Sequence, residues 1–296
     1  MVLIVFRVLW RIFIFLLGVY IIYFAIFRAL PYFEAKLPLA IAVLLIYCLL
    51  AYAAIPALLR LFRLVIKPNH IPMYVTTPDG WPADPVNIAI VAHSKKHFID
   101  AMVKAGWYTA DPPTLKNVIR EAISVIFRTP YPNAPFSKLY LFGRPFDIGF
   151  QMPRDANKSA HARHHVRFWR LMLPEDDNHH HHYHFWHKHL KHLLGTDKEI
   201  WIGAAIDDTG PLAITWRNGQ ITHRNDPLTD NERDFIINTL TQSHKIKRMS
   251  DIQAGEPFKF RGQVLRNKFI CDGSIRVIEL KNPLFINLAS KKSKRV

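Results

Sequence analysis

Cysteine is scarce in this chain: Cys48 and Cys271 are the only two among 296 residues. This excludes a scaffold held together by disulfide bonds and suits a reducing compartment. The chain also lacks a P-loop, Gly-x-Gly-x-x-Gly, Gly-x-Ser-x-Gly, His-Glu-x-x-His and paired Cys-x-x-Cys motifs. The sequence therefore disfavours the common nucleotide-binding folds, α/β-hydrolases and zincins.

Acidic residues are also few, with 23 Asp and Glu against 39 Lys and Arg, which gives a formal charge of +16. Such an excess points to an anionic partner: nucleic acid, a membrane surface or a phosphorylated substrate. Residues 1–67 carry seven Lys and Arg and one Glu, and a basic tail, 286–296, carries four more Lys and Arg. Most of the excess thus lies where anionic lipid headgroups would neutralise it. No nucleic-acid recognition motif is present, so nucleic acid is not an expected partner.

Two long apolar runs near the N-terminus predict a transmembrane hairpin, with spans at about 8–28 and 37–59. A bilayer core needs roughly 20 apolar residues in a helix. Pro31, Glu34 and Lys36 lie in the short connector. The alternatives are a buried helical pair in a soluble protein or, for the first run, a cleaved signal peptide. The first run is longer than a typical signal-peptide core, which favours an uncleaved anchor.

The basic residues around the spans predict their orientation. Five flank the outer ends of the hairpin: Arg7, Arg11, Arg60, Arg63 and Lys67. The connector has only Arg28 and Lys36. Because positive residues favour the cytoplasmic side, we expect an integral protein of a bacterial inner membrane with both termini in the cytoplasm.

Beyond a linker at 68–74, residues 75–285 predict one α+β domain with about three helices and five or six strands. Caps at Ser94 and Thr114 and a capping box formed by Thr229 and Glu232 indicate where the helices begin. The helix after Thr114 has apolar residues at a spacing of 3.6. Apolar or alternating segments indicate strands at 86–92, 146–151, 165–169, 199–206, 220–224 and 274–280.

Two segments offer groups for binding an anion. Arg144 follows a glycine and could hold a phosphate or carboxylate, with Asp147 as a base or metal ligand. The alternative is a turn in which these two residues pair. In the second segment, strand alternation puts His165 and Arg167 on one face with Trp169. These groups supply an acid or base, a fixed cation and an aromatic wall, although polar residues on a half-exposed strand are also ordinary.

Two further segments suggest a divalent metal as a cofactor. Asp207 and Asp208 end a strand, and these adjacent carboxylates, Asp207 above all, could hold a metal ion together with His223 of a neighbouring strand. The alternative is a turn whose carboxylates bond local amides. A histidine-rich insertion at 176–192 would also bind metals, but a tract without fixed geometry is not a specific site.

Taken in order, six segments of the chain resemble the LssY C-terminal domain family. They are Gly106-Trp107 with 111–115, 131–135, 139–145, 164–169, 201–205 and 219–223. In that family the domain often follows multi-span membrane regions, including phosphatidic-acid-phosphatase-like and DedA-like ones. The resemblance implies work at a membrane, with lipid phosphates as candidate substrates, but it assigns no catalytic residue. Unlike the fused members, this chain has only a hairpin before the domain.

These observations leave three hypotheses. The first is a membrane-tethered interaction or regulatory module with the lipid bilayer, anionic headgroups or a membrane protein as partner. The second is an enzyme acting on a phosphorylated lipid or another anionic substrate, with His165 and Asp147 catalytic, Arg144 and Arg167 holding the phosphate, and Asp207 and His223 as metal ligands. The third, ranked lower, is metal storage or sensing by the histidine tract.

Overall fold

The computed structural model describes residues 2–63, 73–78, 80–171, 198–215, 219–254, 257–261 and 268–282. The histidine tract at 176–192, the basic tail at 286–296, Lys67 and most of the linker lie outside the described residues. Arg7, Arg11, Arg60 and Arg63 fall within helices, but their side chains are also outside the description.

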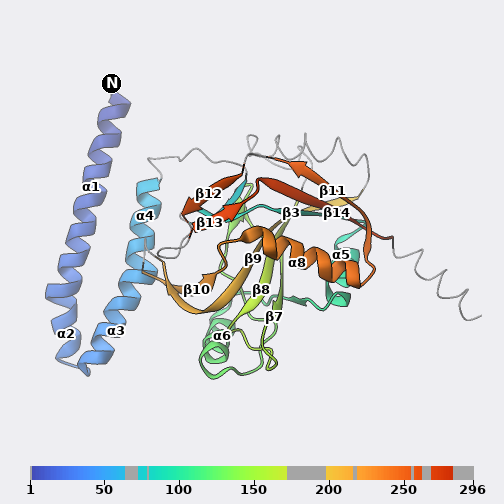
Figure 1. Cartoon of the computed structure of the whole chain (residues 1–296). Helices are drawn as coiled ribbons and strands as arrows, with labels where there is room; N and C mark the ends of the chain where they lie inside the picture. The colour runs from blue at the N-terminus through green and yellow to red at the C-terminus, as the bar shows by residue number, and fades with distance from the viewer. Residues whose placement is uncertain are drawn as a thin grey trace, which may run out of the picture.

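Two antiparallel apolar helices form the N-terminal part of the chain (Figure 1). The first comprises α1 (Val2–Phe24), the π-helical turn η1 (Ala25–Ala29) and α2 (Leu30–Glu34); the second comprises α3 (Leu39–Leu49), η2 (Leu50–Ala54) and α4 (Ile55–Arg63). The segments Ile12–Glu34 and Leu39–Leu58 are long and apolar enough to cross a bilayer. Only 11% and 22% of their most apolar windows are buried, unlike the core helices of a soluble protein. The two helices therefore indicate a membrane anchor.

The rest of the described chain is an α+β domain built on one large mixed sheet, which confirms the predicted fold class. The strand order is β11-β14-β3-β9-β8-β7-β4, with β10 paired to β9. Among the described strands of this sheet, β14 and β3 pair in parallel and the other neighbours are antiparallel. These strands are β3 (Ile88–Ala92), β4 (Tyr108–Thr109), β7 (Ile148–Pro153), β8 (Arg163–Arg170), β9 (Glu199–Ile214), β10 (Ile221–Asn225), β11 (Ile246–Gln253) and β14 (Ser274–Leu280).

Smaller elements surround this sheet. A second sheet has the order β2-β1-β5-β6, and β12 pairs with β13. The bounds are β1 (Tyr74–Thr76), β2 (Pro82–Pro85), β5 (Tyr140–Leu141), β6 (Arg144–Pro145), β12 (Phe258–Arg261) and β13 (Lys268–Cys271). Several of these strands are too short to leave an apolar alternation in the sequence, so the described strands outnumber the predicted five or six.

The described helices of the domain are α5 (Lys95–Lys104), α6 (Leu115–Phe127) and α8 (Thr229–Gln242). Phe98 of α5 and Ile236 of α8 are fully buried in one core cluster against the large sheet. The predicted caps are confirmed for two helices, since the side chains of Ser94 and Thr114 accept hydrogen bonds from the backbone N–H groups of residues 97 and 117.

The predicted capping box of Thr229 and Glu232 is wrong. The N-cap of α8 is Leu228, and it has no side-chain cap. The Thr229 hydroxyl instead donates to the carbonyl oxygen of Ile270 at 3.1 Å. Glu232 lies beside His164 of β8, with 2.7 Å between Oε2 and Nδ1. Partners from distant strands thus replace the local bonds that the pattern predicted.

Candidate functional site

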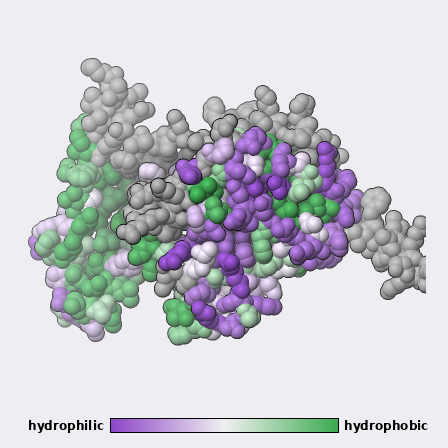
Figure 2. Space-filling model, in the orientation of Figure 1, coloured by the Kyte–Doolittle hydropathy of each residue, from purple (hydrophilic) through white to green (hydrophobic). Residues whose placement is uncertain are grey.

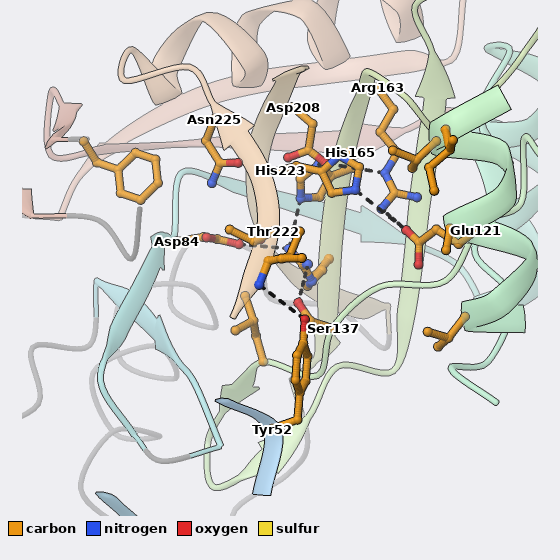
Figure 3. A pocket seen from close by; sticks show the side chains of 18 residues that line it. Tyr52, Asp84, Glu121, Ser137, Arg163, His165, Asp208, Thr222, His223 and Asn225 are labelled. Carbon is orange, nitrogen blue, oxygen red and sulfur yellow. Dashed lines mark hydrogen bonds and ion pairs between the residues drawn. The ribbon is translucent and has the colours of Figure 1, made fainter. Parts of the chain in front are cut away.

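A cavity of about 420 Å³ lies between α6, β10 and the centre of the large sheet. Because side chains alternate along a strand, β8 directs Arg163, His165 and Arg167 toward this cavity. Asp208 of β9 and His223 of β10 reach the same space (Figure 3). Residues from three adjacent strands therefore converge at one place.

The wall of the cavity is largely apolar. The α6 helix supplies Val118, Ala122, Val125 and Ile126. The second apolar helix of the anchor supplies Tyr52, whose hydroxyl accepts a hydrogen bond from the backbone N–H of Ile221 at 3.3 Å. Two further bonds join the anchor to the domain, from Tyr47 Oη to Gly219 O at 2.8 Å and from Gln220 Nε2 to Ala51 O at 3.0 Å. The cavity thus lies at the junction of anchor and domain.

Seven acidic and basic side chains of the cavity form a charged cluster, defined as Asp84, Glu121, Arg163, His165, Arg167, Asp208 and His223. The Nη2 of Arg163 is 2.7 Å from Glu121 Oε1, and its Nε is 3.4 Å from Asp208 Oδ2. The Nη1 of Arg167 is 2.9 Å from Asp84 Oδ2. Both guanidinium groups also lie over the ring of Phe136, at 5.0 and 4.9 Å from its centroid. Two fixed cations are thus held rigidly in the interior.

Burial changes the protonation of this cluster. It raises the pKa of Asp84 and of Asp208 to about 6, even though Arg167 and Arg163 favour the ionised carboxylates. It lowers the pKa of His223 to about 4, and the guanidinium of Arg163 adds to the shift. For His165, burial first and then Arg167 lower the pKa well below its usual value. Both imidazoles are therefore neutral near pH 7, whereas the arginines keep their charge.

Three buried nitrogen atoms of the charged cluster have no hydrogen-bond partner among the described residues: Nδ1 of His165, Nδ1 of His223 and Nε of Arg167. The two imidazole atoms are 3.4 and 4.0 Å from Asp208 Oδ2. The guanidinium nitrogen can only donate, and a neutral imidazole nitrogen donates in one of its tautomers. Leaving a buried donor unpaired costs about 1–3 kcal/mol. These atoms therefore suit a ligand that brings oxygen acceptors.

The structure brings three of the sequence-predicted site residues together, namely His165, Arg167 and His223. It separates Asp207 from them, because Asp207 points to the opposite face of β9 from Asp208. There Asp207 Oδ1 lies 3.6 Å from His164 Nδ1. The predicted sharing of a metal by Asp207 and His223 is therefore corrected.

Arg144 and Asp147 do not line the cavity either. Arg144 Nη1 is 2.7 Å from Asp147 Oδ2, and the same oxygen accepts the backbone N–H of Arg170 at 2.7 Å. This is the paired turn that the sequence left as the alternative. The roles suggested for Arg144 in anion binding and for Asp147 in catalysis find no support in this arrangement.

Three other members of the charged cluster, Arg163, Asp84 and Glu121, are not among the site residues predicted from the sequence. Arg163 extends the alternation of His165 and Arg167 by one step, so the pattern could have revealed it. Asp84 and Glu121 come from β2 and α6, far from β8 in the sequence, and no local sequence pattern identifies them as site residues.

The comparisons with known proteins agree with the resemblance that the motifs suggest. The family model described as LssY C-terminus matches residues 68–274, which include β8, β9, β10 and most of the domain. None of the curated proteins and none of the solved structures compared with the chain matches it.

Proposed function

The chain belongs to the LssY C-terminus family, and we propose that this member is a membrane-anchored domain that binds an amphiphile with an anionic, phosphate-like headgroup. The headgroup lies at the charged cluster and the apolar chain lies along α6. One observation carries this proposal: unpaired donor nitrogens and an apolar wall meet in a single cavity, and the anchor helix forms part of that wall.

An exposed apolar surface at the cavity supports access from a bilayer. Six large apolar residues of α6 are between 45% and 78% exposed: Leu115, Val118, Ile119, Ile123, Ile126 and Phe127. Ile214 and Ile221 of the neighbouring β9–β10 hairpin are also exposed, at 59% and 49%. Figure 2 shows hydrophobic surface at the foot of the domain, where Figure 1 places α6, and along the anchor helices. Apolar surface of this extent is typical of a membrane or protein contact, and the presence of Tyr52 of the anchor in the same cavity wall favours lipid.

If it only binds this amphiphile, the protein is an interaction or regulatory module. The same geometry supports an enzyme as a second candidate. Two neutral imidazoles face one carboxylate, since Nδ1 of His165 and of His223 lie 3.4 and 4.0 Å from Asp208 Oδ2. Neutral histidines beside a bound phosphate ester could transfer a proton to or from it. Conversion of the bound amphiphile would identify an enzyme, whereas binding without conversion would identify a module.

Filling the cavity tests the proposal. Tritiated dioctanoyl phosphatidic acid is the probe, and binding to the purified full-length chain in detergent is measured by scintillation proximity. Ala122→Trp places an indole in the cavity wall and should weaken binding tenfold or more, because the probe's chain loses its space. Lys116 is exposed on the same helix and does not line the cavity. Lys116→Trp is therefore the matched control and should bind as the wild type does. Equal binding by both variants would contradict the cavity as the site.

We also propose that the anchor lies in a bacterial inner membrane and that both termini of the chain are in the cytoplasm. The basic residues outside the hairpin support this orientation. Alkaline phosphatase, which is active only outside the cytoplasm, should stay inactive when fused after Val296, and a cytoplasm-active fluorescent protein should be bright there. High phosphatase activity in that fusion would reverse the orientation.

A further inference from the structure

A second cluster of polar side chains lies on the face of β8 and β9 opposite the cavity. His164 of β8 and Asp207 of β9 are direct cross-strand partners, and Glu232 reaches them from the first turn of α8. We propose that His164, Asp207 and Glu232 form a binding site for one divalent transition-metal ion. The site uses none of the side chains of the charged cluster and is independent of the proposed function.

The distances in this cluster suit a shared ion. His164 Nδ1 is 2.7 Å from Glu232 Oε2 and 3.6 Å from Asp207 Oδ1. One ligand atom from each residue can be chosen so that all three lie within 4.8 Å of one another. With metal–ligand bonds of about 2.1 Å, adjacent ligands of one ion are about 3–3.5 Å apart. Only small side-chain movements would be needed to close the site around an ion.

Unpaired buried oxygens are a second, independent observation. Glu232 is 2% exposed and Asp207 is 7% exposed. Within the described structure, Glu232 Oε1 and Asp207 Oδ1 have no hydrogen-bond partner. Arg154 is 2.7 Å from Asp207, but it contacts the other carboxylate oxygen, Oδ2. Two buried carboxylates placed together repel each other unless a proton or a cation lies between them.

The imidazole of His164 is already held in place for coordination. Its ring stacks on Phe235 of α8, with centroids 3.8 Å apart and planes 17° apart. This packing fixes the ring with Nδ1 toward the two carboxylates, so coordination by Nδ1 requires no reorientation of the ring. A set of one imidazole and two carboxylates matches the preferences of Mn²⁺, Fe²⁺ and Zn²⁺ more closely than those of Ca²⁺ or Mg²⁺.

A neighbouring cluster with similar spacing already contains a positively charged side chain. Asp230, Cys271 and Asp272 also place ligand atoms within 4.8 Å of one another. There, however, Arg233 lies between the carboxylates, 3.2 Å from Asp230 Oδ1 and 3.0 Å from Asp272 Oδ2. A guanidinium already neutralises that cluster, so it needs no metal ion. In the proposed site, Arg154 contacts Asp207 alone, and one oxygen of each carboxylate has no hydrogen-bond partner among the described residues.

Manganese binding tests the proposal, because Mn²⁺ favours carboxylates and interacts weakly with a histidine tract. The purified full-length chain is titrated with Mn²⁺, and free Mn²⁺ is followed by electron paramagnetic resonance. We expect one bound ion per chain, with affinity reduced at least tenfold in Glu232→Gln and in Asp207→Asn. Asp234→Asn removes an exposed carboxylate of the same helix and should bind as the wild type does.

Stability provides a second readout in the same samples. Added Mn²⁺ should raise the melting temperature of the wild type and of Asp234→Asn, but not that of Glu232→Gln, because only a ligand of the folded state stabilises it. Wild-type affinity in both Glu232→Gln and Asp207→Asn would overturn the proposal. So would a wild type that binds no Mn²⁺ and whose melting temperature does not respond, since a shared proton would then explain the unpaired carboxylates.

Discussion

Replacing Arg163 with methionine is expected to lower the free energy of unfolding of the domain by about 3–5 kcal/mol, the usual cost of removing one partner of a buried ion pair. The Arg163 side chain is 5% exposed and contacts Glu121 and Asp208 at 2.7 and 3.4 Å. Its Nη1 also donates to Gln151 Oε1 at 2.8 Å. Methionine fills the space of the aliphatic chain but takes the guanidinium donors away from these oxygens.

Arg170→Met is the matched control from the same strand. Arg170 lies 3.2 Å from Glu199, but its side chain is 51% exposed, and an exposed pair contributes only about 0–1 kcal/mol. Urea denaturation of the full-length chain in detergent, followed by tryptophan fluorescence, measures both variants. Similar midpoints for the two would show that the charged cluster does not hold β8, β9 and α6 together.

A second large loss of stability is expected for Gly203→Ala at the centre of the sheet. A Cβ at position 203 would lie 2.5 Å from Phe168 Cε1 and 2.6 Å from Ile88 Cγ2. Both neighbours are fully buried. They belong to β8 and β3, which pair with β9 on its two sides at this residue. Because both side chains are packed inside the core, they can move away only by displacing other buried groups, so we expect a cost of about 1–3 kcal/mol, as for other overpacked cores.

Gly210→Ala provides the comparison within the same strand. A Cβ at position 210 would meet no atom within 4 Å, so this variant should keep wild-type stability or gain a few tenths of a kcal/mol from a less flexible unfolded chain. The melting temperatures of the two variants, measured side by side, test this expectation. A Gly203→Ala protein as stable as Gly210→Ala would mean that β3, β8 and β9 pack less tightly than the structure describes.

Part of the site could be predicted because strand alternation and helix capping depend on residues only a few positions apart. Alternation along β8 predicted that His165 and Arg167 share one face, and both side chains line the cavity. The caps at Ser94 and Thr114 were also correct, since a cap needs only a residue three positions away.

Distant partners account for what could not be predicted. The 3.6-residue period of α6 identified an amphipathic helix, but a period does not say what covers the apolar face, and here Leu115 and Phe127 are 78% and 70% exposed. The spacing of Thr229 and Glu232 suggested a cap, whereas Glu232 pairs with a strand 68 residues away. Asp84 reaches Arg167 across 83 residues. Contacts at such separations follow from the fold and leave no local pattern.

The central claim is that an amphiphile lies in the cavity between α6 and β10, and locating the bound molecule tests it most directly. A phosphatidic acid probe with a photoreactive diazirine in its acyl chain is added to the full-length protein in phosphatidylcholine nanodiscs, and labelled peptides are identified by mass spectrometry. We predict labelling within residues 118–126 and 221–223, with labelling there reduced in Ala122→Trp and unchanged in Lys116→Trp. Labelling confined to the anchor helices, or equal labelling in both variants, would contradict the claim.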